Sequence, residues 1–198
     1  MRTPWTLWTC VSVVLEGRRP ILAEVQALVT PAAGERPRRT TSGVDASRLA
    51  MLAAVLQQRS KLHLHNRDVF ASTVGGVRIT ETAADLATAI AIASAWKSRE
   101  VPTDLVAIGE IGLAGELRRV RDLPQRIAEA ARLGFGAAIV PLEPGARSGS
   151  LRKVGGIEVV GVPDVDAALR VLDLGRESST PVFRAEDRAP SRPDLGLV

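Results

Sequence analysis

Hydrophobic positions recur with two spacings along the chain, and the spacing separates predicted strands from predicted helices. β-branched and apolar residues alternate with others over residues 10–15 and 21–29, which predicts two strands joined as a hairpin. Apolar residues return every three or four positions after Asp45, which predicts a helix to about residue 59 with Asp45 as its cap. A helix predicted to start at Thr80 or Thr82 and to end near Trp96 is apolar on most sides, which is typical of a buried helix.

The rest of the chain has shorter patterns. They predict strands over residues 68–74, 77–80, 105–108, 116–120, 137–140 and 157–160, and helices over residues 122–133 and 164–172. Asp122 followed by Gln125 has the spacing of a capping box, whereas residues 30–43 hold proline and glycine breakers and are predicted to be a loop. Strands and helices alternate in mixed order with short connections, so we expect one α/β (α+β) domain.

The two ends of the chain differ from this pattern. Residues 1–9 match no element, and residues 175–198 are polar with three prolines, so we expect a disordered tail there. The predicted domain therefore spans residues 10–174.

Composition narrows the class of protein. Of the 198 residues 45% are hydrophobic but only 3% aromatic, so the core must be built from small aliphatic side chains. Cys10 is the only cysteine, which excludes an intrachain disulfide and fits a reducing cytoplasm. No apolar run approaches the roughly 18 residues of a membrane span, and no signal peptide is visible, so we expect a soluble cytoplasmic protein without a membrane partner.

Motifs for cofactor chemistry are missing. A P-loop needs Gly-Lys before a hydroxyl residue, and none of the three lysines follows a glycine. His63 and His65 could share a metal ligand in an extended segment, but no second Cys or His pair exists, and two partly exposed histidines are the favoured interpretation. We therefore expect no cofactor and no metal in this chain.

Five blocks of sequence carry a family resemblance. They are LEGRRPILAEVQALV (15–29), PRRTTSGVDASRLAMLAAVLQQR (37–59), DVFASTVGGVRITETAADLA (68–87), LVAIGEIGLAGELRRV (105–120) and RIAEAARLGFGAAIVP (126–141). In this order they resemble the C-terminal, Lon-protease-like domain of the bacterial RadA/Sms DNA repair family over roughly residues 10–172. The resemblance implies a mixed sheet packed with helices. Magnesium-chelatase-type ATPases share this scaffold, but the PRRTTSG and GEIGLAGELRRV blocks favour RadA/Sms.

The resemblance also identifies the positions of the Lon-type catalytic dyad. A Lon-type peptidase uses a Ser nucleophile and a Lys base, and here Ala83 and Arg126 occupy the corresponding positions. Alanine has no nucleophilic atom, and arginine stays protonated, so it cannot act as the base. Ser72 and Thr82 are nearby hydroxyls, and Lys97 is the nearest lysine by helix position, several turns from Thr82. We predict no catalytic residue in this chain.

For function, the resemblance implies a part in recombinational repair. Family members join a zinc-ribbon segment and a RecA-like ATPase to this domain, promote branch migration on DNA and form hexameric rings, with a recombinase filament as a further candidate partner. Zinc, ATP and Mg²⁺ belong to those other domains, which these 198 residues do not contain. The implied role is a non-catalytic domain for ring assembly and DNA contact.

The positive charge supplies candidate DNA-binding residues. Residues 1–61 hold nine Arg and Lys against four Asp and Glu, although the net charge of the chain is only +4. The candidates for one positive surface are Arg18, Arg19, Arg36, Arg38, Arg39 and Arg48. No aromatic residue interleaves with them, so base stacking is not expected. A second run at residues 118–121 is flanked by Glu116 and Asp122.

Two alternatives stay open beside the DNA-contact role. The arginines could be solvated or pack against a neighbouring subunit, which would make the chain an oligomerisation scaffold without DNA binding. An active Ser-Lys peptidase is the third interpretation, and the residues at positions 83 and 126 argue against it.

Overall fold

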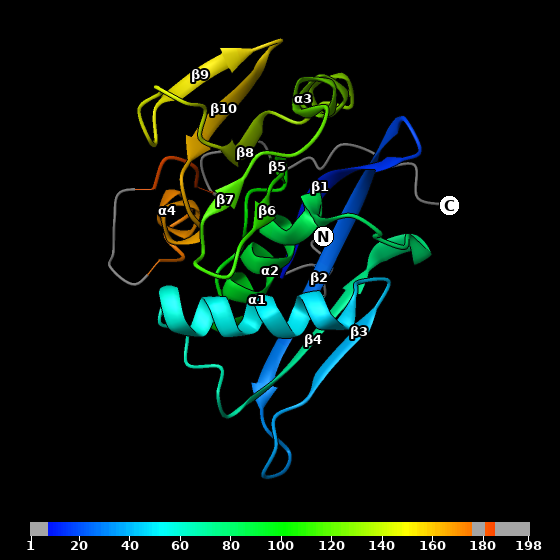
Figure 1. Ribbon diagram of the computed structural model, residues 1–198, viewed down its shortest axis with the longest axis vertical. Helices are drawn as coiled ribbons and strands as arrows, with labels where there is room; N and C mark the ends of the chain where they lie inside the picture. The colour runs from blue at the N-terminus through cyan, green and yellow to red at the C-terminus, as the bar shows by residue number, and fades with distance from the viewer. Residues whose placement is uncertain (1–7, 176–180, 185–198) are drawn as a thin grey trace, which may run out of the picture.

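The computed structural model describes residues 8–175 and 181–184 of the chain (Figure 1). The strands in these ranges are β1 (Thr9–Glu16), β2 (Arg19–Pro31), β3 (Arg39–Ser42), β4 (Arg67–Thr73), β5 (Leu105–Ala107), β6 (Glu110–Ile111), β7 (Leu117–Arg118), β8 (Ala137–Pro141), β9 (Leu151–Val154) and β10 (Ile157–Val162). The α-helices are α1 (Ala46–Arg59), α2 (Asp85–Lys97), α3 (Leu123–Arg132) and α4 (Val165–Val171), with short 3-10 helices η1 (Val74–Gly76) and η2 (Thr82–Ala84).

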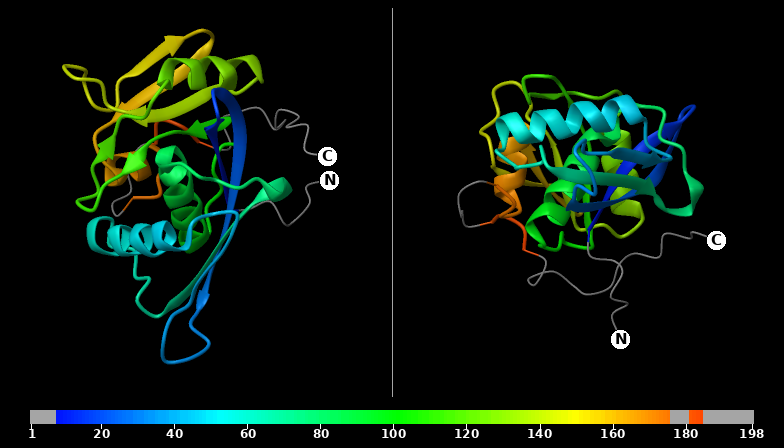
Figure 2. Two further views of the ribbon diagram at one scale, coloured as in Figure 1. Left: turned by 45° about the vertical axis from the view of Figure 1, so that its right-hand side comes forward. Right: turned by 90° about the horizontal axis from the view of Figure 1, so that it is seen from below.

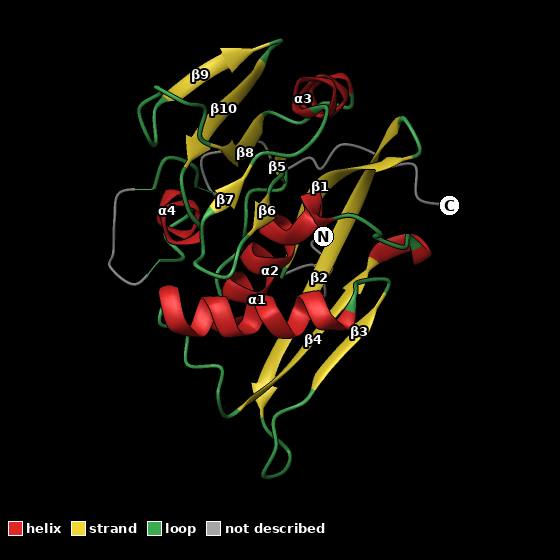
Figure 3. Cartoon of the chain, viewed as in Figure 1, coloured by secondary structure: helices red, strands yellow, loops and turns green. Residues whose placement is uncertain are grey.

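Eight strands form one mixed sheet in the order β3-β4-β2-β1-β5-β8-β10-β9, which leaves β3 and β9 at its edges (Figure 3). β1 pairs antiparallel with β2, and β2 with β4, whereas β5, β8 and β10 continue the sheet in parallel from β1. β6 and β7 form a separate two-stranded ribbon. The expected α/β (α+β) fold, a mixed sheet packed with helices, is confirmed.

Helices cover the sheet on both faces (Figure 2). α1, α2 and α4 share one core group with the inward residues of the sheet, such as Val25 and Val69. α3 lies on the opposite face, where Ile127 packs with Val11 and Val106 in a second core group. In the described part of the chain no helix is long and apolar enough to cross a membrane.

The helices on the inner face follow the sequence pattern. Asp45 caps α1 by accepting a hydrogen bond from the backbone N–H of Arg48 at 2.8 Å, as the spacing predicts. α2 is buried from Asp85 to Ala95, which agrees with its apolar residues on every side. Small alanine side chains let this helix lie close to β1 and β2.

Two edge strands are absent from the sequence prediction. β3 lies inside the segment predicted to be a loop, and its sequence RTTS is polar. β9 is exposed at every position, so it lacks the alternation that marks a half-buried strand. Both strands exist because they pair with a neighbour, β3 with β4 and β9 with β10.

Two local predictions were wrong. Residues 77–80 form no strand; only Ile79 is tied in, through its N–H to the carbonyl of Gly43 at 2.8 Å. Asp122 makes no side-chain cap, because its backbone is left-handed with φ 55°, whereas a capping residue is extended. Its carbonyl instead accepts the N–H of Arg126 at 3.1 Å.

Part of the predicted tail belongs to the domain. The N–H groups of Val182 and Phe183 donate to the carbonyl of Val171 at 2.9 and 3.2 Å, and the Phe183 side chain is buried in the main core. The rest of the predicted tail, residues 176–180 and 185–198, lies outside the described residues. The same holds for most of the atypical first segment, of which only Trp8 and Thr9 are described.

Candidate functional site

The residue predicted to occupy the nucleophile position of the Lon-type dyad lies in the core. Ala83 is part of η2, just before α2, and is 2% exposed. Its carbonyl accepts the N–H of Gly109 at 2.8 Å and the hydroxyl of Ser12 at 3.4 Å. Position 83 therefore anchors the start of α2 and offers no nucleophile.

The residue predicted to occupy the base position is a buried arginine. Arg126 on α3 is 1% exposed. Its guanidinium binds both carboxylate oxygens of Glu81, at 2.5 and 2.8 Å, and also donates to the carbonyls of Val13 at 2.7 Å and Arg121 at 2.8 Å. Glu81 in turn accepts the N–H of Leu15 at 2.6 Å. Arg126 thus joins α3, β1 and the segment before α2, and an arginine side chain cannot act as a base.

The remaining hydroxyl and amine candidates are kept apart. Thr82 donates its hydroxyl to Glu110 at 2.6 Å, whereas Lys97 donates to the carbonyl of Gly175 at 2.6 Å. Thr82 precedes α2 and Lys97 ends it, so the rise of the helix separates them by about 20 Å. Ser72 lies on β4 and projects from the face of the sheet that is turned away from α2. These residues therefore do not form a Ser/Thr-Lys pair.

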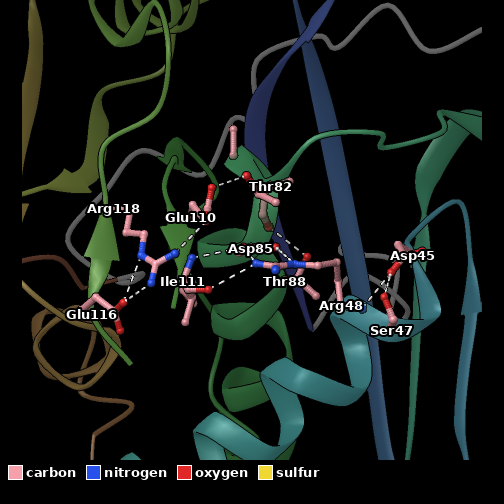
Figure 4. Close-up of polar contacts among 12 residues, drawn as sticks. Asp45, Ser47, Arg48, Thr82, Asp85, Thr88, Glu110, Ile111, Glu116 and Arg118 are labelled. Carbon is pink, nitrogen blue, oxygen red and sulfur yellow. Dashed lines mark hydrogen bonds and ion pairs between the residues drawn. The ribbon is translucent and has the colours of Figure 1, made fainter. Parts of the chain in front are cut away.

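A polar network surrounds the start of α2 (Figure 4). Asp85 accepts from the Nε of Arg48 at 3.2 Å, from its Nη2, and from the N–H of Ile111 at 3.1 Å. Arg48 also donates to the carbonyl of Ile111 at 3.2 Å. Burial raises the pKa of Asp85, although the hydrogen bonds from Arg48 and Ile111 oppose that rise. The network ties α1 to α2 and β6, and it leaves the Arg48 side chain only 29% exposed.

A cleft of about 740 Å³ lies beside this network. Its walls are β3, the first turn of α1 and residues 78–82, with Arg48 and Asp85 among its lining residues. Arg48 was predicted to belong to a DNA-contacting surface, but its charge is directed into the ion pair at this cleft.

The other predicted DNA-binding arginines fall into two groups. Arg18 and Arg19 are exposed at the turn between β1 and β2. The loop between β2 and β3 lies at the opposite end of β2 (Figure 1). Arg36 and Arg38 lie in this loop, and Arg39 is the first residue of β3. β2 has 13 residues, so its ends lie about 40 Å apart. The expectation of one continuous positive surface is therefore wrong, because the long strand separates the two groups.

Arg38 in this loop and Arg39 at the start of β3 have structural roles. Arg39 donates to the carbonyls of Arg67 at 2.6 Å and Leu64 at 3.0 Å. Arg38 pairs with Asp68 at 3.3 Å, although its side chain remains 64% exposed. Arg36 is exposed and has no ion-pair partner among the described residues. The loop therefore presents Arg36 and Arg38 to solvent, while Arg39 holds β3 in place.

Asp68 organises this loop. It accepts the N–H of Arg38 at 2.7 Å and the N–H of Ala33 at 3.4 Å, and the side chain of Arg38 binds it as well. The backbone hydrogen bond from Arg38 is the main cause that lowers the pKa of Asp68 below its ordinary value.

Replacing Asp68 by Asn is expected to lower the urea midpoint at neutral pH, because the ionised form is the one that the loop stabilises. A lowered folded-state pKa gives stability that is present above the unfolded pKa of about 3.9 and is lost as pH falls through the folded value. Urea titrations of both proteins between pH 7 and 3 test this. The difference should shrink below about pH 4, and a difference independent of pH would contradict the assignment.

Two of the three arginines in the second run, Arg118 and Arg121, form ion pairs with acids. Arg118 binds Glu116 at 2.6 Å and Glu110 at 3.5 Å, and Arg121 pairs with Asp122 at 3.5 Å. His63 and His65 contact each other edge to face, with ring centroids 6.2 Å apart. In the described residues, no group of three or more His, Cys, Asp or Glu could hold a metal ion.

Comparison with known proteins assigns this chain to a family. The chain matches subunit ChlI of Mg-chelatase over residues 45–144, slightly more than half of its length. The chain belongs to this ChlI family. The matched residues run from the cap of α1 through α2, the polar network and α3 to just beyond the end of β8.

Similar proteins share sequence well beyond that range. DNA repair protein RadA of Mycolicibacterium smegmatis (strain ATCC 700084 / mc(2)155) is 49% identical over 164 residues, which are 83% of this chain and 34% of that protein. DNA repair protein RadA of Escherichia coli (strain K12) is 45% identical over 168 residues, 85% of this chain and 36% of that protein. The ChlI-family chain thus spans about a third of the length of these relatives. The resemblance to the RadA/Sms C-terminal domain is confirmed.

Proposed function

We propose that the ChlI-family chain is a non-catalytic domain of a RadA/Sms-type DNA repair protein, where it contacts DNA and supports ring assembly during branch migration. The relatives that cover most of the chain are named for DNA repair. ATP hydrolysis, with its Mg²⁺, and the zinc site belong to parts of the protein outside this chain. A recombinase filament is a further candidate partner of the whole protein.

The observation that carries the non-catalytic role is the Arg126–Glu81 ion pair beside Ala83. Of the two positions that the resemblance assigns to the dyad, one holds a methyl group and the other a buried guanidinium bound to protein oxygens. A domain that keeps the scaffold and lacks the nucleophile and the base is suited to binding and assembly.

DNA contact is supported by the exposed arginines at the two ends of β2. The hairpin turn projects Arg18 and Arg19, and the loop projects Arg36. Guanidinium groups bind phosphate oxygens in bidentate geometry. Such contacts to phosphate, at either end of β2, do not depend on the base sequence. Contacts at both ends of β2 would allow the domain to bind a nucleic-acid backbone along the whole length of this β-strand.

Fluorescence anisotropy with labelled duplex and single-stranded DNA tests the proposal. For about three phosphate contacts, affinity should fall about 40-fold between about 50 and 200 mM salt. The double change Arg18→Glu/Arg19→Glu and the single change Arg36→Glu should each weaken binding, and Arg36→Glu should lower the salt slope by about one. Arg38 and Arg39 are left unchanged because their substitution would disturb the loop and β3.

The matched control is Arg147→Glu/Lys153→Glu, which reverses two exposed charges near β9, far along the sheet from β3. It should bind DNA nearly as the unchanged protein does. A folded protein that binds neither DNA at low salt would contradict the DNA-contact role and leave the oligomerisation scaffold.

A further inference from the structure

The turn between β6 and β7, residues 112–115, presents an apolar side chain to solvent and is here called the tip. Leu113 stands in this turn and is 78% exposed, more than any other large hydrophobic residue in the described part of the chain. Its neighbours in the turn are two glycines and Ala114, so no bulky or charged side chain of the turn shields it. A lone exposed leucine is ordinary on a protein surface, but this one is held in a fixed place.

Hydrogen bonds hold the tip in one conformation. The N–H of Gly112 donates to the carbonyl of Glu116 at 3.0 Å, and the N–H of Gly115 donates to the carbonyl of Gly112 at 2.9 Å. The Glu116 carboxylate accepts the N–H of Ala114 at 3.1 Å and occupies the space that a Cβ at Gly112 would need. The Gly115 carbonyl accepts the N–H of Val165 at 2.9 Å, which ties the tip to the start of α4. A turn that is already ordered loses little conformational entropy when a partner covers it.

An apolar groove lies on the far face of the sheet. Leu28 on β2 is 49% exposed and pairs with Phe70 on β4. Both project from the face turned away from α1, because side chains alternate along a strand and their chain neighbours Ala27 and Val69 point into the main core. A shallow groove of about 700 Å³ runs over them, and none of the described residues that line it is charged. The groove therefore suits an uncharged apolar group rather than a polyanion.

The tip and the groove of one molecule cannot meet. The tip lies beside the end of α1 and the start of α4, since a Cβ at Gly115 would contact Arg59 and Val165. The groove is on the other face of the sheet, at the end formed by β2, β4 and β3 (Figure 1, Figure 2). Each can therefore be covered only by another molecule, and every copy of the chain carries one tip and one groove.

We propose that Leu113 of one copy inserts into the groove of a second copy, against Leu28 and Phe70, so that copies of the chain associate head to tail. This contact deepens the ring-assembly part of the proposed function and rests on it. Burial of the two leucines removes apolar surface from water, which favours association. Only 3% of the residues are aromatic, so aliphatic groups supply most apolar contacts of this chain. Two different surfaces meet, so each added copy leaves one tip and one groove free until a ring closes.

Sedimentation velocity of the full chain tests the contact with two variants. Leu113→Asp alters the tip and Leu28→Asp the groove, and each places a charge in the contact. The unchanged chain should sediment faster as its concentration rises, whereas association of each variant should weaken about tenfold or more. Both residues are exposed, so circular dichroism and the urea midpoint should stay the same. The matched control is Leu151→Asp on β9, where the side chain is 50% exposed, and it should associate as the unchanged chain does.

A mixture of the two variants decides whether the contact is head to tail. Leu113→Asp keeps its groove and Leu28→Asp keeps its tip, so an equimolar mixture should form one-to-one dimers that do not grow further. Variants that stay monomeric in the mixture would overturn the proposal, because that is the result of a symmetric contact between like surfaces. An unchanged chain that is monomeric throughout the concentration series would overturn it as well, and so would full association of Leu113→Asp.

A second measurement uses introduced cysteines. The native Cys10 is buried, so oxidation should join only the introduced residues. Leu113→Cys mixed with Leu28→Cys should form a disulfide-linked heterodimer faster than either variant alone forms a homodimer, because the two Cα atoms must come within about 7 Å. Faster homodimer formation by either variant would contradict the head-to-tail contact.

These outcomes separate the tip-to-groove contact from the rest of the proposed function. Association that persists in both Asp variants would leave ring assembly standing on another surface. Salt-dependent DNA binding through Arg18, Arg19 and Arg36 needs neither the tip nor the groove, so it would leave the DNA-contact role standing even if the chain stayed monomeric.

Discussion

Replacing Arg126 by Ala should lower the free energy of unfolding by about 3–5 kcal/mol, because the change removes one partner of a buried ion pair. Glu81 would lose both of its contacts to the guanidinium. The carbonyls of Val13 and Arg121 would lose their donor as well, and a cavity would remain between α3 and β1. Urea denaturation followed by circular dichroism measures the loss.

Two comparisons isolate the cause. Arg126→Ala/Glu81→Ala should be less destabilised than the sum of the single changes, since neither charge is then left alone. Arg132→Ala lies on the same helix, where its side chain is 66% exposed and pairs with Glu129, and should cost less than about 1 kcal/mol. If Arg126→Ala were as mild as Arg132→Ala, the ion pair would not be a structural element of the fold.

The Arg126 result bears on what the residue at the predicted base position does in the fold. The Arg126 guanidinium joins three segments of the chain through hydrogen bonds. Lysine at the same position could not bind both oxygens of Glu81 in the same geometry while also reaching two carbonyls. Stability and peptidase chemistry therefore place opposite requirements on residue 126, and the observed residue meets the first.

Much of this fold could be predicted from sequence because its signals are local. The Asp45 cap depends only on residues 45–48, and the β1–β2 hairpin on alternation around a short turn. The buried character of α2 follows from its composition. β3 could not be predicted in this way, since RTTS is polar and becomes a strand only through pairing with β4, some 30 residues later.

The candidate site shows the same division. The prediction of a missing dyad rests on the residue identities at positions 83 and 126. The partners of the buried polar residues could not be predicted, because Glu81 and Arg126 are 45 residues apart, and Arg48 and Asp85 are 37 apart. Sequence grouped six arginines by proximity along the chain, whereas the length of β2 separates them and ion pairs occupy Arg38 and Arg48.

The second large effect is expected in the segment after residue 180. Its sequence is polar and contains proline, but one of its residues, Phe183, is part of the core. Replacing Phe183 by Ala should lower the free energy of unfolding by about 3–5 kcal/mol, the usual loss for a buried phenylalanine. The Phe183 side chain is 3% exposed and packs in the main core with residues of α4 such as Leu169 and Val171. Thermal and urea denaturation of the full chain measure the loss.

Val182→Ala is the matched control, because Val182 is the preceding residue, also binds the carbonyl of Val171 through its N–H, and is 43% exposed. Its cost should stay within about 0.5 kcal/mol, as for other surface substitutions. A large loss at 183 with little at 182 would mean that the side chain, and not the backbone contact, joins this segment to α4. Small and equal effects of the two substitutions would mean that residues 182 and 183 add little to the free energy of unfolding. The domain boundary expected near residue 174 would then mark the end of the part that stabilises the fold, even though Phe183 lies in the core.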